Sequence, residues 1–237
     1  MKFSQILQES FFLPPAGKRF SRYLLVPLMA FLIPTALAAQ PKEAASPDAI
    51  AEKLNAVPVY YLERNSGKSH TVDAGPDKPA VAPVFFYSGS ASSLRDDLLT
   101  KTPPIETSLV RAGLGKIYLN MRNPEKSDFR YALIADPTQV DAARRITGNE
   151  DFNETPVFAV RQKEEGGFLT MKNPDGTVAL PLFIESQRAY AALNIVLQQN
   201  KDMDGKLAVS ALPLQTAIND MIGGRLEANA VVFIPPQ

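Results

Sequence analysis

The chain has 237 residues, of which 45% are hydrophobic, with 20 prolines and 13 glycines. This composition favours one sizeable globular unit, or two small units that share a core, and excludes a wholly disordered chain. The absence of cysteine excludes disulfides, cysteine-based zinc sites and thiol chemistry.

The first 38 residues have the pattern of a secretory signal peptide. An apolar run at residues 23–33 follows the basic residues Lys18, Arg19 and Arg22, and residues 36–38 read ALA. This arrangement predicts cleavage after Ala38. An uncleaved anchor is the alternative, but a membrane-spanning helix needs about 20 apolar residues. Cleavage would leave 21 basic and 24 acidic side chains, a formal charge of −3, which offers no electrostatic surface to nucleic acid or anionic lipid.

Residues 39–49 are predicted to form a flexible tail that leads into a short helix. Ile50, Leu54 and Val57 recur at the spacing of one helical face. Asp48, which follows Pro47, is the predicted N-cap of this helix.

A short phrase then occurs twice in the chain. Residues 57–64 read VPVYYLER, and residues 155–162 read TPVFAVRQ, 98 positions later. The same offset relates Pro83 to Pro181 and Leu109 to Leu207, and an offset of 100 relates residues 131–134 to 231–234. This pattern predicts an internal duplication of about 100 residues, with one half at 50–153 and the other at 154–237.

The two halves show the same order of predicted elements. Each begins with a proline-led strand, continues with a second strand at 69–72 or 167–171, and reaches a third at 81–88 or 178–184. The NPDG sequence at 173–176 predicts a hairpin turn. A helix follows each third strand, with Ser88 and Ser186 as predicted N-caps, and a short strand, a short helix and a closing strand complete each half.

Only the first half continues into a further helix. Asp136, Pro137 and Gln139 are typical of a helix start, and the second half ends without an equivalent segment. The predicted fold is α+β: two similar halves of mixed sheets with helices packed on them, related by a pseudo-twofold axis within one compact body.

The third strands are apolar on both faces in both halves. A sheet with one solvated face alternates apolar and polar residues, so the second face is either covered by protein or left as an apolar groove. On the second interpretation, the groove binds segments of other polypeptides. Its predicted peptide-binding residues are Tyr60, Phe85, Tyr87, Phe158 and Phe183.

No set of residues indicates catalysis, a metal or a cofactor. His70 is the single histidine and is predicted to lie on the surface. No nucleophile elbow, zinc motif or calcium loop occurs, and GLG at residues 113–115 lacks the spacing of a phosphate-binding loop. The adjacent carboxylates at 96–97 and 164–165 are interpreted as solvated charge. We therefore predict a protein that is not an enzyme and has no cofactor.

Taken together, these phrases resemble the Tic22-like family, the twenty-two-kilodalton Tic components of chloroplast protein import and their cyanobacterial relatives. The matching segments are residues 57–62, 83–91, 136–142, 155–160 and 181–189. The resemblance implies a butterfly-like α+β body of two halves, located between two membranes. It also implies that apolar pockets bind precursors in transit, and that cyanobacterial members act in outer-membrane biogenesis beside the β-barrel insertase and its POTRA domains. The second half departs from the first by lacking the DPxQV helix.

The resulting hypothesis is a periplasmic chaperone or assembly factor that binds unfolded or translocating polypeptides. The signal peptide favours a cyanobacterial periplasmic protein, with the thylakoid lumen or plastid intermembrane space as alternatives. The alternative function is a docking module for a folded partner, such as the POTRA domains, that binds no client.

Overall fold

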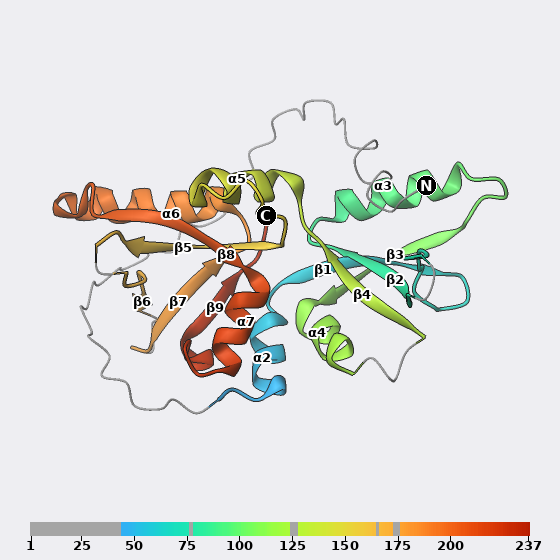
Figure 1. Ribbon diagram of the computed structural model, residues 1–237, viewed down its shortest axis with the longest axis horizontal. Coiled ribbons are helices and arrows are strands. Elements are labelled where there is room, and N and C mark those ends of the chain that lie inside the picture. Colours follow the sequence, from blue (N-terminus) through green and yellow to red (C-terminus); the bar gives the residue numbers. More distant parts are fainter. Residues whose placement is uncertain (1–43, 76–77, 124–127, 165, 173–175) are drawn as a thin grey trace.

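The computed structural model describes residues 44–75, 78–123, 128–164, 166–172 and 176–237 (Figure 1). The predicted signal peptide, residues 39–43 of the predicted tail and most of the predicted NPDG turn lie outside the described residues. The first half contains α2 (Pro47–Leu54), β1 (Pro58–Arg64), β2 (Ala80–Phe85), α3 (Ser88–Leu99), β3 (Thr107–Gly113), α4 (Leu114–Arg122), β4 (Phe129–Ile134) and α5 (Pro137–Thr147). The second half contains β5 (Pro156–Gln162), β6 (Met171–Lys172), β7 (Val178–Phe183), α6 (Ser186–Gln199), η2 (Lys201–Met203), β8 (Leu207–Pro213), α7 (Leu214–Ile222), η3 (Ala228–Ala230) and β9 (Val231–Ile234).

Each half forms one mixed sheet, and the two sheets share one topology. The strand order is β3-β1-β2-β4 in the first, while in the second β5 lies between β8 and β7, and β9 pairs with β7. In both sheets the first strand is antiparallel to its two neighbours. The closing strand runs parallel to its partner, β4 to β2 in the first sheet and β9 to β7 in the second. The repeated phrases are therefore the first strand of each sheet, with Tyr60 opposite Phe85 and Phe158 opposite Phe183. The α+β prediction is confirmed, and an origin by duplication stays a prediction.

The offset between the halves changes earlier than the sequence indicated. Leu62 lies opposite Leu109 in the first sheet, whereas Val160 lies opposite Val209 in the second. The predicted match of Leu109 with Leu207 was therefore wrong, because the offset is already 100 at this strand. Helix α6 has 14 residues where α3 has 12, which accounts for the two additional positions.

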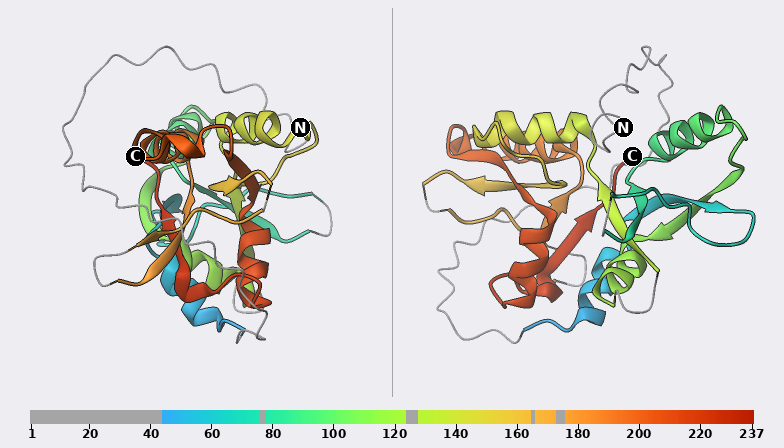
Figure 2. Two further views of the ribbon diagram at one scale, coloured as in Figure 1. Left: turned by 90° about the vertical axis from the view of Figure 1, so that its left-hand side faces the viewer. Right: turned by 45° about the vertical axis from the view of Figure 1, so that its right-hand side comes forward.

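The inner faces of the two sheets share one core. Helices α2, α4 and α7 gather against these faces (Figures 1 and 2). Fully buried side chains of this core come from both halves: Ile50, Leu54, Leu114, Ile117, Leu182, Leu214, Met221 and Phe233. The two halves therefore bury their apolar surfaces against each other.

The GLG sequence has a packing role where α2 crosses the junction of β3 and α4. A Cβ atom added to Gly115 would lie 1.9 Å from the carbonyl oxygen of Ala51, and one added to Gly113 would lie 2.6 Å from Oδ1 of Asn55. Glycine at these positions allows the backbones to approach closely.

The outer faces of the sheets are covered unequally. Helices α6 and α5 lie side by side over β5 and β8, whereas α3 lies over the first sheet (Figures 1 and 2). Phe183 on β7 is 7% exposed beneath α6, and Phe85 is 5% exposed. Both faces of the third strands are thus apolar because both are covered.

Two of the helices that the structure describes begin with a side-chain cap. The Ser46 hydroxyl accepts a hydrogen bond from the Ala49 amide at 3.2 Å, so Asp48 was wrongly predicted as the cap and lies within the first turn. The helix starts at Pro47, inside the segment predicted as a flexible tail. Asp136 caps α5 as predicted and accepts a bond from the Gln139 amide at 3.1 Å.

Ser88 and Ser186 are the first residues of their helices and were wrongly predicted as caps. The cap positions are held by Tyr87 and Glu185, whose side chains do not bond their own helix. Instead, the Ser186 amide donates to Oε1 of Gln139 at 2.9 Å, so that α5 caps α6 from outside.

The predicted second strands are almost absent from the described residues. In the first half, only isolated bridges join Ser69 to Glu63 and Val72 to Val81. In the second, β6 is limited to Met171 and Lys172, although it pairs antiparallel with β7 as a hairpin would.

His70 is buried, at 4% exposure, so its predicted surface position was wrong. Its amide donates to the carbonyl oxygen of Leu62, as that of Leu169 donates to Val160 in the other half. Neither ring nitrogen has a hydrogen-bond partner among the described residues. Burial, and secondly the charge of Arg64, lower the pKa of His70 below its ordinary 6.5.

His70→Leu introduces the side chain of Leu169, whose amide makes the equivalent backbone bond in the second half. The substitution is expected to raise the free energy of unfolding by about 1 kcal/mol, because it removes an unpartnered buried group. The gain should grow as the pH falls below 6.5, since the unfolded chain then binds a proton that the folded chain resists. Urea unfolding at pH 8 and pH 5 measures both effects. Parallel pH dependences for the two proteins would contradict this account.

Candidate peptide-binding cleft

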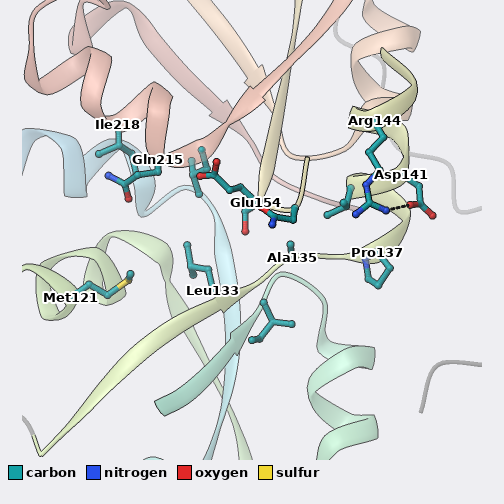
Figure 3. Close-up of a pocket in the computed structure, with 14 residues that line it drawn as sticks. Met121, Leu133, Ala135, Pro137, Asp141, Arg144, Glu154, Gln215 and Ile218 are labelled. Carbon is teal, nitrogen blue, oxygen red and sulfur yellow. Dashed lines mark hydrogen bonds and ion pairs between the residues drawn. The ribbon is translucent and has the colours of Figure 1, made fainter. Parts of the chain in front are cut away.

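A cleft of about 580 Å³ lies between the two halves. Figure 3 shows Met121 at one end, Asp141 and Arg144 at the other, and Leu133, Ala135 and Glu154 between them. The lining is apolar along its length with polar groups at intervals: Met121, Leu133, Ile134, Ala135, Pro137, Val140, Asp141, Arg144, Asn153, Glu154, Thr155, Leu214, Gln215 and Ile218. Its volume is within the range of about 300–1,000 Å³ typical of ligand pockets.

One wall of the cleft is the end of an edge strand. Strand β4 is last in the order of the first sheet, and β2 is its only strand partner among the described residues. Leu133 and Ile134 therefore line the cleft from a sheet edge, where backbone groups can pair with an added strand. The opposite wall comes from α7, through Leu214, Gln215 and Ile218.

The polar end of the cleft is held by Arg144 on α5. Its Nη1 lies 3.2 Å from Oδ1 of Asp141, and its Nε donates to the carbonyl oxygen of Phe152 at 2.9 Å. These contacts tie the segment leading into β5 to α5 and so set the position of Asn153 and Glu154 at the cleft.

Outside the cleft, a hydrogen bond joins the two halves at the starts of α3 and α6. The Tyr87 hydroxyl donates to Oε1 of Glu185 at 3.2 Å, between two residues that occupy equivalent positions in the halves. Burial, followed by the charge of Glu185, raises the pKa of Tyr87 well above its usual range. Tyr87 therefore stays a neutral donor at physiological pH.

The five aromatic residues predicted from the sequence do not line this cleft. Phe158 is fully buried beneath α5 and α6, and Phe183 is nearly so beneath α6. Phe85 is buried on the outer face of the first sheet, and Tyr60 and Tyr87 are half-buried. The structure brings Tyr60 and Phe85 together, and likewise Phe158 and Phe183, as cross-strand pairs. Peptide binding by these five residues stays a prediction.

Sequence reasoning missed most residues of the cleft. The signal that could have found some of them was the DPTQV motif, since Pro137, Val140 and the following Asp141 line it. Met121 and Leu133 carried no such signal, because they meet the residues of α7 only after the two halves have packed together.

The described residues contain neither a candidate metal-binding cluster nor a candidate membrane span. No cluster of three or more histidine, cysteine, aspartate or glutamate side chains that could hold a metal occurs in this part of the chain. Among the helices that the structure describes, none is both long and apolar enough to span a bilayer.

Comparison with known proteins identifies the family of the chain. The model of the Tic22-like family matches residues 8–237. Anabaena Tic22, described with the words protein transport, superposes with a TM-score of 0.69 at 20% identity, over 81% of this chain and 93% of that one. Tic22 from Plasmodium falciparum gives a TM-score of 0.60 at 18% identity, over 79% and 91%. No curated protein matches the chain. Because the family model spans almost the whole sequence, the chain belongs to the Tic22-like family.

Proposed function

We propose that this chain is a non-enzymatic protein-transport factor of the periplasm. It binds polypeptides in transit reversibly and so supports outer-membrane biogenesis. The observation that carries the proposal is the apolar cleft beside the edge of β4. Membership of the Tic22-like family and the protein-transport description of Anabaena Tic22 support it.

The geometry favours an extended client segment. Such a segment would place alternate apolar side chains against Met121, Leu133 and Ile218, while its backbone pairs with the edge of β4. Gln215 and Glu154 would bond polar groups along the segment. Release requires only dissociation, because the contacts are apolar burial and exchangeable hydrogen bonds.

The predicted aromatic residues enter this proposal in two ways. Tyr60 and Tyr87 keep exposed surface and offer secondary contacts to a client. Phe85, Phe158 and Phe183 support the sheets beneath their helices and would reach a client only after those helices moved.

Met121→Asp is expected to weaken client binding about tenfold or more, because burying a methionine side chain contributes about 1.5–3 kcal/mol. Met121 is 40% exposed, so the substitution should leave the fold intact. The chain contains no tryptophan, so an unfolded, tryptophan-bearing outer-membrane barrel protein supplies the signal. Its emission should shift to the blue, and its light scattering should fall, as the wild-type protein is added.

Leu99→Asp is the matched control, because Leu99 is 46% exposed on α3, outside the cleft. It should bind the client as the wild type does. Equal binding by the wild type, Met121→Asp and Leu99→Asp would show that the client does not bind in the cleft. Failure of the wild type to bind the unfolded barrel, together with binding of folded POTRA domains, would favour the docking-module alternative.

A further inference from the structure

The two outer sheet faces differ by one helix. In the second half, α6 packs on β5 and β8, and α5 packs beside it on the same two strands. In the first half, α3 takes the place of α6 on β1 and β3, and no described helix takes the place of α5. The helix that ends the first half thus covers the sheet of the second (Figures 1 and 2).

The side chains beneath α5 are buried, and their equivalents in the first half are not. Phe158 and Val209 are 0% and 8% exposed, while Tyr60 and Leu109, at the same register positions, are half-buried. Ala192 on α6 is buried, and Leu94, the equivalent residue on α3, is half-buried. These differences define an open strip formed by Tyr60, Leu94, Leu109 and Arg111.

The second half also shows what fits such a strip. Helix α5 turns small apolar side chains toward β5 and β8, and Val140, Ala142 and Ala143 are buried there. The open strip has the same backbone framework as the face under α5, because β1 and β3 pair in the same antiparallel register as β5 and β8. Helix α3 lies beside the strip as α6 lies beside α5. A helix of similar width and small side chains is therefore the complementary shape.

Charge distinguishes the open strip from the face under α5. Arg111 lies opposite Tyr60 where the second half has Ala211 opposite Phe158, and Arg64 follows on the same face of β1. Both arginines are exposed, and neither has a carboxylate within 4.0 Å among the described residues. An occupant of this strip should therefore carry carboxylates beside its apolar face.

We infer that the open strip is a docking site for an amphipathic helix of a partner protein, with small apolar residues on one face and flanking acidic residues. The strip lies on β1 and β3, and the cleft lies at β4 on the opposite edge of the same sheet. A partner docked at the strip would leave the cleft itself open to a client and would cover only the secondary contact at Tyr60.

The test uses the absence of cysteine from the chain. Leu109→Cys, labelled with a polarity-sensitive dye, reports on the strip, and Leu94→Cys is a second reporter should the first fail to fold. The probe is a hydrocarbon-stapled peptide with the sequence of residues 136–148 in which both arginines are replaced by glutamate. A second stapled peptide keeps the arginines. A label at exposed Gln198 on α6 is the control position.

The acidic peptide should shift the emission of the Leu109 label saturably and leave the Gln198 label unchanged. It should bind about fivefold more tightly than the arginine-containing peptide, as expected for a few exposed ion pairs, and Arg111→Glu should reverse this order. Absence of a saturable shift with either reporter, or a preference unaffected by Arg111→Glu, would overturn the inference. A shift on concentrating the protein alone would also overturn it, because a second copy would then cover the strip.

Discussion

Phe158→Ala is expected to lower the free energy of unfolding by about 3–5 kcal/mol, the usual cost of truncating a fully buried phenylalanine. Phe158 is completely inaccessible between β5 and the two helices α5 and α6. Its loss would leave a cavity lined by aliphatic side chains that three elements hold in place. Urea unfolding followed by far-ultraviolet circular dichroism measures the change.

Tyr60→Ala is the matched substitution, because Tyr60 has the same register position in the first sheet. It should cost only about 1 kcal/mol, since its side chain is half-buried and less of its apolar surface is removed from water. Equal losses for the two variants would mean that the outer face of the first sheet is as well covered as that of the second. The open strip would then have no basis.

Gly115→Ala is expected to destabilise the protein by about 3 kcal/mol, at the upper end of the usual cost of overpacking. The new Cβ would lie 1.9 Å from the carbonyl oxygen and 2.7 Å from the carbonyl carbon of Ala51. Both contacts are to backbone, so no side chain can rotate away and α2 itself would have to move. Since α2 packs against α4, α7 and β9, that movement would open the core between the halves.

Gly89→Ala is the control for this second prediction. Gly89 lies in α3, and a Cβ there would meet no atom within 4 Å. The substitution should raise the free energy of unfolding by up to about 1 kcal/mol, because alanine is the better helix former. If Gly115→Ala were as stable as Gly89→Ala, the close approach of α2 and α4 would be contradicted.

Local sequence pattern predicted those elements whose signal is local. The proline-led phrases are the first strands of the two sheets, and Asp136 begins a helix as its capping pattern indicated. Ile50 and Leu54 are buried on one face of α2, as their spacing predicted, whereas Val57 is buried beyond the end of the helix and was wrongly placed on it. Each of these features depends on side chains a few residues apart, which a sequence displays directly.

The failed predictions concern groups whose partners are distant. Ser186 resembled a cap, but its amide bonds Gln139, 47 positions away. His70 resembled a surface residue because its neighbours are polar, yet its backbone pairs with Leu62 and its ring lies in the interior. A polar neighbourhood along the chain does not report which side of the segment faces the core.

The candidate site was beyond the sequence for the same reason. The sequence left open whether the second face of each third strand is covered or forms a groove, because the helices that pack on the outer faces come from elsewhere in the chain. The cleft, in turn, combines Met121 and Leu133 of one half with Ile218 of the other. Its shape depends on how the two sheets pack against each other, and no sequence motif predicts that packing.

By itself, the sequence determined the α+β class, the repeated first strands, the two similar halves and the family resemblance, because periodicity, capping and repetition can be recognised in the sequence alone. Only the tertiary structure decided which surfaces stay open. Helix α5 belongs to the first half by sequence, but it packs on β8 and β5 of the second. The buried apolar residues of α5 pack against this sheet alone. Because α5 packs on the second sheet, the outer face of that sheet is closed. The outer face of the first sheet keeps a strip that a partner can fill.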